Sequence, residues 1–416
     1  MSDALAEAAR LIAAGRYDQA LKLLAPLTAP ERFALLGKAW LGRRKAGPAL
    51  ENLKKALSHE PGDAPSLLAL AKARLAGLDS GAAVTLLQAL QNRAPELQGV
   101  GEALAIAYRR DALYEKAVAL ADADPDPSPS ILYERALCLL MLGQPSLPAF
   151  DRLLDAAPNH AAGWFWSHAA ALEVNGWPDA DRRLTKAAEI PGANRKYQGF
   201  LAAYDILRGA ADPRPCPIAF RHLAEGAASV RAFCPEPPKL FGVPGRLLAW
   251  SLQQAISDGM ICEFGVRRGN SIRQLAAATE QMVHGFDSFI GLPEGWVQAP
   301  AGVLTTAGDL PVVPKNVRLH AGWFEDSLPP FLAEHRERLR FANIDCDIYS
   351  STRTVLRALQ PRIEAGCVLV FDELIGNRTW MHDEFKALME WAGEFSRQFA
   401  GIAVNLAGKQ VAIILR

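Results

Sequence analysis

Residues 262–271 read CEFGVRRGNS, the pattern of a buried strand, a glycine turn and the start of a helix. Glycines let the backbone approach a ligand without a Cβ clash, and a helix start favours a carboxylate. The spacing from Gly265 to Gly269 is G-x-x-x-G, whereas a nicotinamide fingerprint needs G-x-G-x-x-G. Glu263 precedes the first glycine, where it could accept bonds from an ammonium group. The stretch favours a cofactor bearing an amino acid over a dinucleotide; a purely structural glycine turn is the alternative.

Three further acidic signatures follow where the hydropathy pattern predicts that strands end. They read Phe286-Asp287-Ser288, Ile344-Asp345-Cys346-Asp347 and Phe371-Asp372-Glu373. In an open parallel sheet the carboxyl ends of the strands share one edge, and ligands bind in the crevice there. Asp287 suits a ribose diol, which offers two donors to one carboxylate, although an Asp that caps the turn before Gly291 is the alternative. Together the four signatures predict one composite site.

The acids near the ends of the fourth and fifth expected strands indicate a metal site. Asp345 and the Asp372-Glu373 pair are 27 residues apart, the length of one strand-helix-strand crossover. Adjacent strand ends would bring three carboxylates together, and such a cluster repels itself unless it binds a hard cation such as Mg²⁺. Ordinary helix capping is the alternative, because Asp345 and Asp347 both precede a helix expected to start around Ser350.

Strand and helix patterns alternate from residue 245 to residue 416. Strands are expected at 260–265, 283–287, 317–320, 339–345, 367–372, 401–406 and 410–415, and helices at about 245–257, from Asn270, near 328–337, at 351–360 and at about 381–398. Such alternation produces a parallel sheet with helices on both faces. Gly408-Lys409 is a hairpin turn candidate, so the last strand should enter antiparallel. We predict a doubly wound, seven-stranded Rossmann-like sheet of the class I methyltransferase type.

Residues 1–212 are rich in Ala and Leu and show helical periodicity. Small residues recur at steps of 29, 34, 34, 29 and 34 residues, at Ala20, Ala49, Ala83, Ala117, Ser146 and Ala180. The residue four positions later is Leu24, Leu53, Leu87, Ala121, Phe150 or Leu184. This resembles the tetratricopeptide repeat, in which a 34-residue unit forms two antiparallel helices. We expect about six units to stack into an all-α superhelix. Its role is either partner binding or dimerisation and spacing.

The expected boundary is the Pro-rich stretch 213–244, a linker that could hold one short helix at 218–233. Lys+Arg and Asp+Glu both number 45, so no net charge attracts the chain to nucleic acid or an anionic membrane. The first residues lack a signal-peptide pattern, and no apolar run approaches the ~20 residues that span a bilayer. The six cysteines form no C-x-x-C pair, which favours a reducing cytoplasm over a disulfide framework.

The strand-end residues of roughly 240–416 resemble the macrocin O-methyltransferase family. The similarity rests on Gly285–Phe289, Gly291–Glu294, Gly322–Pro329, Ile344–Thr352 and Phe371–Glu373. The resemblance implies an S-adenosylmethionine-dependent, metal-requiring enzyme that methylates sugar hydroxyls of natural products. For the cofactor it implies a site made of Glu263, Gly265, Gly269, Ser271, Asp287, Ser288, Phe324 and Glu325, and for Mg²⁺ a site made of Asp345, Asp372 and Glu373.

The expected reaction is attack of a deprotonated hydroxyl on the sulfonium methyl, with Asp345 or Asp347 taking the proton. His382 and Lys386 are candidates for substrate contact. The more distantly similar catechol O-methyltransferase has a lysine as base where this chain has Ile348, so the base stays open. Two alternatives remain: a glycosyltransferase that uses Asp345-Cys346-Asp347 as a metal-binding D-x-D, and a non-catalytic repeat scaffold. The first leaves Glu263 and Asp287 unexplained.

Overall fold

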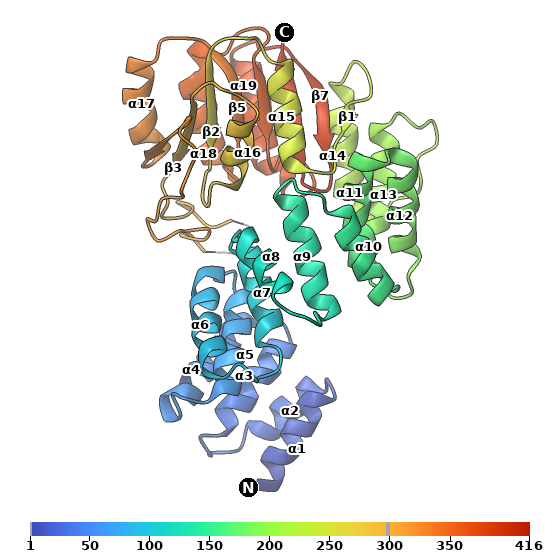
Figure 1. Cartoon of the computed structure of the whole chain (residues 1–416), viewed down its shortest axis with the longest axis vertical. Coiled ribbons are helices and arrows are strands. Elements are labelled where there is room, and N and C mark those ends of the chain that lie inside the picture. Colours follow the sequence, from blue (N-terminus) through green and yellow to red (C-terminus); the bar gives the residue numbers. More distant parts are fainter. Residues whose placement is uncertain (1, 297–299) are drawn as a thin grey trace. The chain divides into compact units, whose positions relative to one another are not determined.

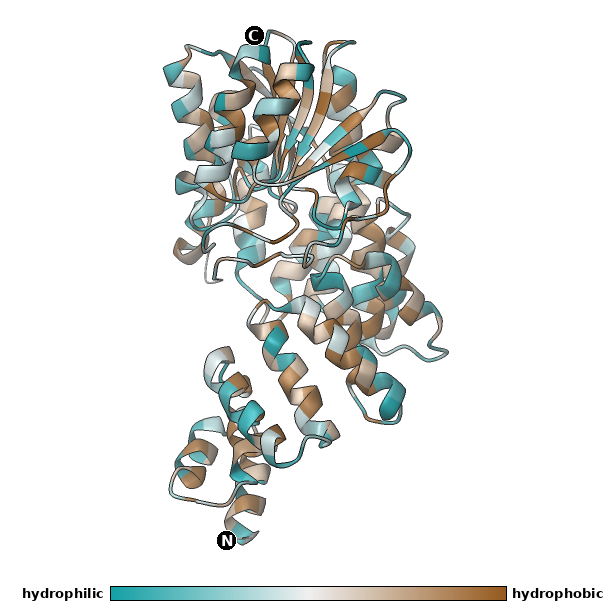
Figure 2. Cartoon of the chain, turned by 90° about the vertical axis from the view of Figure 1, so that its left-hand side faces the viewer, coloured by the Kyte–Doolittle hydropathy of each residue, from teal (hydrophilic) through white to brown (hydrophobic). Residues whose placement is uncertain are grey.

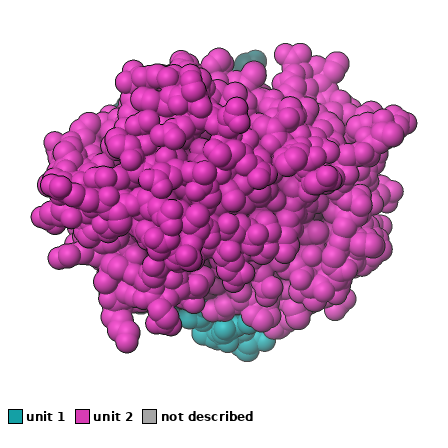
Figure 3. All heavy atoms as spheres, turned by 90° about the horizontal axis from the view of Figure 1, so that it is seen from above, with its two compact units in different colours: residues 1–135 teal, residues 136–416 magenta. Residues whose placement is uncertain are grey.

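The computed structural model describes residues 2–296 and 300–416, and the chain divides into two compact units (Figures 1 and 3). Unit 1 comprises residues 1–135 and unit 2 residues 136–416. The division falls inside helix α9 (Pro129–Met141), within the helical repeats and not in the Pro-rich stretch. The domain bounds expected at 212 and 244 stay a prediction.

Unit 1 consists of paired helices. They are α1 (Ser2–Ala13), α2 (Tyr17–Leu24), α3 (Arg32–Gly42), α4 (Ala46–His59), α5 (Ala64–Ala76), α6 (Ser80–Arg93), α7 (Val100–Arg110), α8 (Tyr114–Asp122) and the first half of α9. Local sequence sets their starts. Asp63, for example, caps α5 by accepting the backbone N–H of Ser66 at 3.0 Å, with a proline in the first turn. An N-cap of this kind stabilises a helix by about 1 kcal/mol.

The predicted repeat register is confirmed. The recurring alanines fall in the second helix of each pair and are fully buried, for example Ala20, Ala49 and Ala83, and Ser146 is the N-cap of the equivalent helix, which begins at Leu147. The bulky residues four positions later are equally buried, for example Leu53 and Phe150. Each such side chain contributes about 1.5–3 kcal/mol by burial. Because a small residue lets two helices approach, the bulky one fills the neighbouring groove.

The helices continue into unit 2. They are α10 (Leu147–Ala156), α11 (Ala161–Val174), α12 (Trp177–Glu189), α13 (Lys196–Leu207), a short 3-10 turn (Ile218–Phe220) and α14 (Arg221–Ala232). The last of these lies in the Pro-rich stretch, where one short helix was expected. Helices α11 to α14 belong to the same unit as the sheet.

The sheet of unit 2 has eight strands in the order β1-β7-β8-β6-β5-β2-β3-β4. Their bounds are β1 (Lys239–Leu240), β2 (Met260–Phe264), β3 (Val283–Asp287), β4 (Val317–Ala321), β5 (Leu339–Ile344), β6 (Val368–Phe371), β7 (Phe399–Asn405) and β8 (Gln410–Leu415). Strand β8 runs antiparallel to both β6 and β7, as predicted. The prediction of seven strands missed β1, which lies inside the expected linker and pairs with β7 to form one edge of the sheet. Two residues are too short for a periodicity signal.

The helices that cover the sheet are α15 (Pro244–Gln254), α16 (Asn270–Ala277), α17 (Phe324–Glu334), α18 (Tyr349–Leu359) and α19 (Glu384–Glu394). Two 3-10 turns, Gln360–Arg362 and Trp380–His382, complete this part. Helix α17 was expected near 328–337, yet it begins at Phe324 and ends at Glu334. Glu325 and Asp326 lie in its first turn, where acids favour a helix N-terminus.

Two hydrophobic layers enclose the sheet, so the doubly wound class is confirmed. One layer packs α15 and α16 against side chains such as Ile261, and the other packs α17, α18 and α19 against side chains such as Phe264. The second layer also contains Phe165 of α11 and Tyr204 of α13. Figure 2 shows hydrophobic residues along the strands and hydrophilic ones on the outer helices. Within the described residues, no helix combines the length and apolar character needed to cross a bilayer.

Candidate active site

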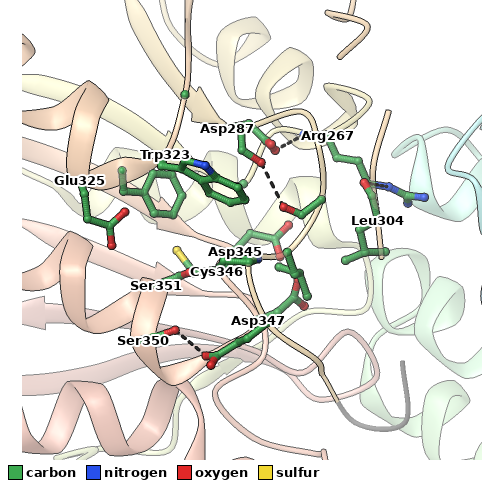
Figure 4. Close-up of a pocket in the computed structure, with 18 residues that line it drawn as sticks. Arg267, Asp287, Leu304, Trp323, Glu325, Asp345, Cys346, Asp347, Ser350 and Ser351 are labelled. Atoms are coloured by element: carbon green, nitrogen blue, oxygen red, sulfur yellow. Dashed lines mark hydrogen bonds between the residues drawn. The ribbon is translucent and has the colours of Figure 1, made fainter. Parts of the chain in front are cut away.

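A cavity of about 510 Å³ lies at the carboxyl ends of the parallel strands (Figure 4). The chain segments that follow β2, β3, β4 and β5 contribute its walls, as expected for an open sheet. The lining residues are Gly265, Arg267, Asp287, Ser288, Gly291, Leu292, Pro293, Glu294, Leu304, Gly322, Trp323, Phe324, Glu325, Asp345, Cys346, Asp347, Ser350 and Ser351. Seven of the sequence-predicted site residues therefore meet at one cavity: Gly265, Asp287, Ser288, Phe324, Glu325, Asp345 and Asp347.

Asp287 joins the first two strand ends. One of its oxygens accepts the backbone N–H groups of Val266 and Arg267, both at 2.8 Å, and the other accepts that of Phe289 at 2.6 Å. The side chain thus fixes the glycine turn after β2 and the turn after β3 while it borders the cavity. Both roles proposed from sequence, turn capping and facing a ligand, are compatible with this position.

Gly265 is required by packing. Its φ is +96°, and a Cβ there would lie 1.9 Å from the backbone oxygen of Asp345. The turn after β2 therefore packs closely against the end of β5, and Gly265 lies next to Asp345. Gly269, with φ +75°, is the N-cap of α16 and does not line the cavity.

Glu263 lies beneath the glycine turn. It is fully buried, and its carboxylate accepts hydrogen bonds from Ser271 Oγ at 2.9 Å and Asn343 Nδ2 at 3.1 Å. Burial raises the pKa of Glu263 to about 8. Neither Glu263 nor Ser271 lines the cavity, so their predicted contact with the cofactor stays a prediction.

An aromatic group borders the side of the cavity formed by β4 and α17. Trp323 and Phe324 line it, and Phe324 meets Phe264 edge-on at 5.8 Å between ring centroids. Glu325 Oε1 accepts a hydrogen bond from Thr354 Oγ1 at 3.0 Å. The sequence pointed to Phe324 and Glu325 but missed Trp323, although a tryptophan after a glycine at a strand end was a usable signal.

Asp345 and Asp347 follow β5 and both face the cavity (Figure 4). Burial, and then the carboxylate of Asp372, raises the pKa of Asp345 well above its ordinary value. Burial and Glu373 do the same for Asp347, and they raise the pKa of Asp372 to about 7. Because their ionised forms also repel one another, each acid makes it harder for its neighbours to lose a proton. Asp347 has a left-handed φ of +61°, a conformation that costs a non-glycine residue energy and often marks a functional site.

The remaining two metal candidates do not line the cavity. Asp372 accepts a hydrogen bond from Gln410 Nε2 at 2.6 Å, and Glu373 binds Lys409 Nζ and the amide of Asn377. In the parts of the chain that the structure describes, no three His, Cys, Asp or Glu side chains are grouped so as to hold a metal. The donors themselves are of the right kind, since Mg²⁺ prefers carboxylate oxygens and would relieve the repulsion among these acids.

Glu384 is a central residue that sequence reasoning missed. It is fully buried at the start of α19. One carboxylate oxygen accepts the backbone N–H of Cys346 at 3.2 Å, and the other accepts that of Glu373 at 3.0 Å. It thereby ties the segment after β5 to the segment after β6. Its sequence context, one acid among several, gave no signal of this role.

The loop over the cavity is attached to α18. Ser350 Oγ donates to Glu294 Oε1 at 2.6 Å, and both residues line the cavity. Lys386, expected near the substrate, lies instead over the ring of Tyr349 at 4.4 Å, and neither it nor His382 lines the cavity. Their suggested contact with substrate stays a prediction.

Comparison with known proteins matches residues 262–374 to a family described as "Methyltransferase domain". This part of the chain is a methyltransferase domain. The match agrees with the predicted resemblance to methyltransferases, and it runs from within β2 past the end of β6 and includes the acids Asp345, Asp372 and Glu373.

A curated relative is the 8-demethyl-8-(2,3-dimethoxy-alpha-L-rhamnosyl)-tetracenomycin-C 4'-O-methyltransferase of Streptomyces olivaceus, 29% identical over 154 residues. The match covers 30% of this chain and 58% of the relative's length. Solved structures similar to parts of the chain include CalS11, a calicheamicin methyltransferase (25% identity, TM-score 0.35, covering 41% of this chain and 76% of that one). They also include a thermophilic TPR protein of Thermus thermophilus (22% identity, TM-score 0.32, covering 41% and 98%).

Proposed function

We propose that this chain transfers a methyl group from S-adenosylmethionine to a hydroxyl of a sugar or a sugar-bearing metabolite, with the help of Mg²⁺. The observation that carries the proposal is the cavity within the methyltransferase domain, where a glycine turn, Asp287, an aromatic wall and Asp345 meet. A nucleoside with a charged amino-acid end requires these groups: backbone at close approach, a carboxylate for the ribose and a flat apolar surface for the base.

The chain's own residues would hold the cofactor as follows. Asp287 already binds the two turns and presents its carboxylate to the cavity, where a ribose diol can donate to it. Trp323 and Phe324 offer ring faces or edges to the adenine. Gly265 lets the turn approach the methionine end, and Ser288 stabilises the next turn by donating to the backbone oxygen of Gly291 at 3.1 Å.

Asp345, Asp372 and Glu373 would hold Mg²⁺, since their oxygens are the ligands that this ion prefers. S-adenosylmethionine supplies an electrophilic methyl carbon, and a bound divalent cation lowers the pKa of a hydroxyl that it contacts. Asp347 faces the same cavity, and a raised pKa makes its carboxylate a stronger acceptor for the proton of the substrate hydroxyl. We therefore assign Asp347 as the general base.

The substrate class follows from two supports. The curated relative is named for methylation of a rhamnosyl 4'-oxygen, and the cavity of this chain is also lined by Glu294, Ser350 and Ser351. Hydroxyls and carboxylates are the groups that recognise sugar hydroxyls by hydrogen bonds. A glycosyltransferase, the alternative, has no support from the family match.

The test is methyl transfer by the full chain from labelled S-adenosylmethionine to a panel of nucleotide sugars and glycosides, with Mg²⁺ and with a chelator. Calorimetric titration measures cofactor binding separately. Asp345→Ala should abolish transfer and leave cofactor affinity within about threefold, since Asp345 belongs to the metal site. Asp212→Ala, an exposed site in the Pro-rich stretch, is the matched control and should behave as the wild type. Unaltered turnover in Asp345→Ala would remove the metal role.

For the helical repeats we propose partner binding or self-association, because stacked helix pairs present an extended surface. For the location we propose a reducing cytoplasm, since all six cysteines are free. Size-exclusion chromatography with light scattering tests self-association, and fractionation of cells tests the location.

A further inference from the structure

The hairpin that ends the chain extends to the acid cluster. Strand β8 pairs with β6 so that Phe371 lies opposite Val411, which places the hairpin turn next to the residues that follow β6. The turn is well fixed: the backbone N–H of Gly408 donates to Asn405 Oδ1 at 3.0 Å. Lys409 follows with a left-handed φ of +64°. Two consecutive residues of this hairpin, Lys409 and Gln410, contact the two consecutive acids Asp372 and Glu373.

Lys409 is bound to both oxygens of one acid. Its Nζ lies 3.0 Å from Glu373 Oε1 and 2.9 Å from Oε2. The side chain of Glu373 is 12% exposed and that of Lys409 is 33% exposed, so water only partly screens this pair. Lysine has a flexible stem that can withdraw a compact ammonium without a change in the backbone.

Gln410 plays a different part. It is 2% exposed, donates to Asp372 Oδ1 at 2.6 Å, and accepts from Asn405 Nδ2 at 3.3 Å. Because Gln410 is itself held at both ends, it fixes the orientation of Asp372. Gln410 therefore orients Asp372, and the neighbouring Lys409 neutralises Glu373.

We infer that Lys409 is the counter-ion of Glu373 in the cation-free protein, and that a divalent cation and the Lys409 ammonium compete for this carboxylate. The inference rests on the proposed function, which places Mg²⁺ at Asp345, Asp372 and Glu373. In this structure both carboxylate oxygens of Glu373 are engaged by Lys409 of the hairpin. Lys409 thus sets how tightly the site binds its cation.

The test measures cation binding by the full chain without cofactor or substrate, by calorimetric titration with MgCl₂. Lys409→Met keeps the length of the side chain and removes the charge. We expect Lys409→Met to bind Mg²⁺ about tenfold more tightly than the wild type, because removing one partner leaves Glu373 an uncompensated charge. Lys409→Arg keeps the competing charge and should bind no more tightly than the wild type. Lys315→Met, at an exposed site away from the acids, is the matched control and should leave the affinity unchanged.

Thermal unfolding of each variant checks that it folds, and Lys409→Arg provides the comparison if Lys409→Met does not. Magnesium affinity that is equal or weaker in Lys409→Met, or magnesium binding absent from both proteins, overturns the inference. Failure of the proposed function is a separate result, namely no binding of S-adenosylmethionine and no methyl transfer. If the protein is an active methyltransferase and its magnesium affinity is the same in Lys409→Met, only the proposed role of Lys409 is rejected.

Discussion

Glu384 accepts the backbone N–H of Cys346 at 3.2 Å, although 38 residues separate them in the sequence. The same carboxylate accepts the N–H of Glu373, so one buried side chain joins the two acid-bearing segments. Burial raises the pKa of Glu384 well above its ordinary value. Two backbone N–H groups from different segments depend on this one buried carboxyl group as their acceptor, so Glu384 positions both segments.

Replacing Glu384 by Ala should therefore reduce both stability and turnover. Two buried N–H groups would lose their acceptor, which costs about 1–3 kcal/mol of unfolding free energy for each unsatisfied group. Denaturant unfolding measures this loss, and methyl transfer measures the displacement of the acids. Glu280→Ala, at an exposed site, is the control and should change stability by less than about 0.5 kcal/mol. Full activity in Glu384→Ala would contradict a positioning role.

Gly265→Ala should prevent correct closure of the cavity wall. The new Cβ would meet the backbone oxygen of Asp345 at 1.9 Å in a conformation with positive φ, so the turn after β2 must move. We expect a loss of several kcal/mol in stability, on the order of other strained core substitutions, and loss of cofactor binding in calorimetry. Gly393→Ala in α19 meets nothing within 4 Å and should stabilise the helix by up to about 1 kcal/mol.

Trp323 should contribute to cofactor affinity through its ring. Trp323→Ala removes an aromatic surface that lines the cavity, and stacking of a base on such a ring is worth about 1–3 kcal/mol. We expect affinity for S-adenosylmethionine to fall by roughly tenfold or more, measured by calorimetry. Trp323→Phe retains a flat ring and should stay within about threefold. Equal losses in both variants would argue that the indole has another function.

Acid should destabilise unit 2 through a buried histidine. His168 is fully buried and its pKa is lowered by burial from 6.5 to about 4, so the unfolded chain takes up the proton more readily. Stability is fully present above pH 6.5 and is lost as the pH falls toward 4. Between pH 7 and pH 5 the loss from His168 is about 2 kcal/mol. Urea unfolding at several pH values measures it, and His168→Gln should flatten the dependence; an unchanged slope in that variant would exclude His168 as its source.

Much of the site could be predicted because strand ends obey a simple rule. Acids and glycines that follow buried strands of a parallel sheet meet at one edge, so Gly265, Asp287 and Asp345 were brought together by topology alone. The register of the helical repeats could also be predicted, because a small residue and a bulky residue four positions later must be buried in each repeat and therefore recur at regular spacing in the sequence.

The missed residues share a physical cause. Glu384, Lys409 and Gln410 act through contacts that depend on the seating of α19 and on the register of an antiparallel hairpin, and no periodicity encodes either. Asp347 was named from the sequence both as a possible helix cap and as a possible proton acceptor, and the structure places it in the lining of the cavity. The two-residue strand β1 is too short to leave a pattern.

The apolar layer that joins α11 and α13 to the sheet has a practical consequence for anyone who wishes to study the catalytic half alone. A shortened chain that starts at Gly245 would lack Phe165 and Tyr204, which belong to the same hydrophobic cluster as Leu369 and Val404 of the sheet. Such a fragment should aggregate. A fragment that begins at Ala136 keeps these hydrophobic residues, so a truncated form of the protein should not be shorter than this.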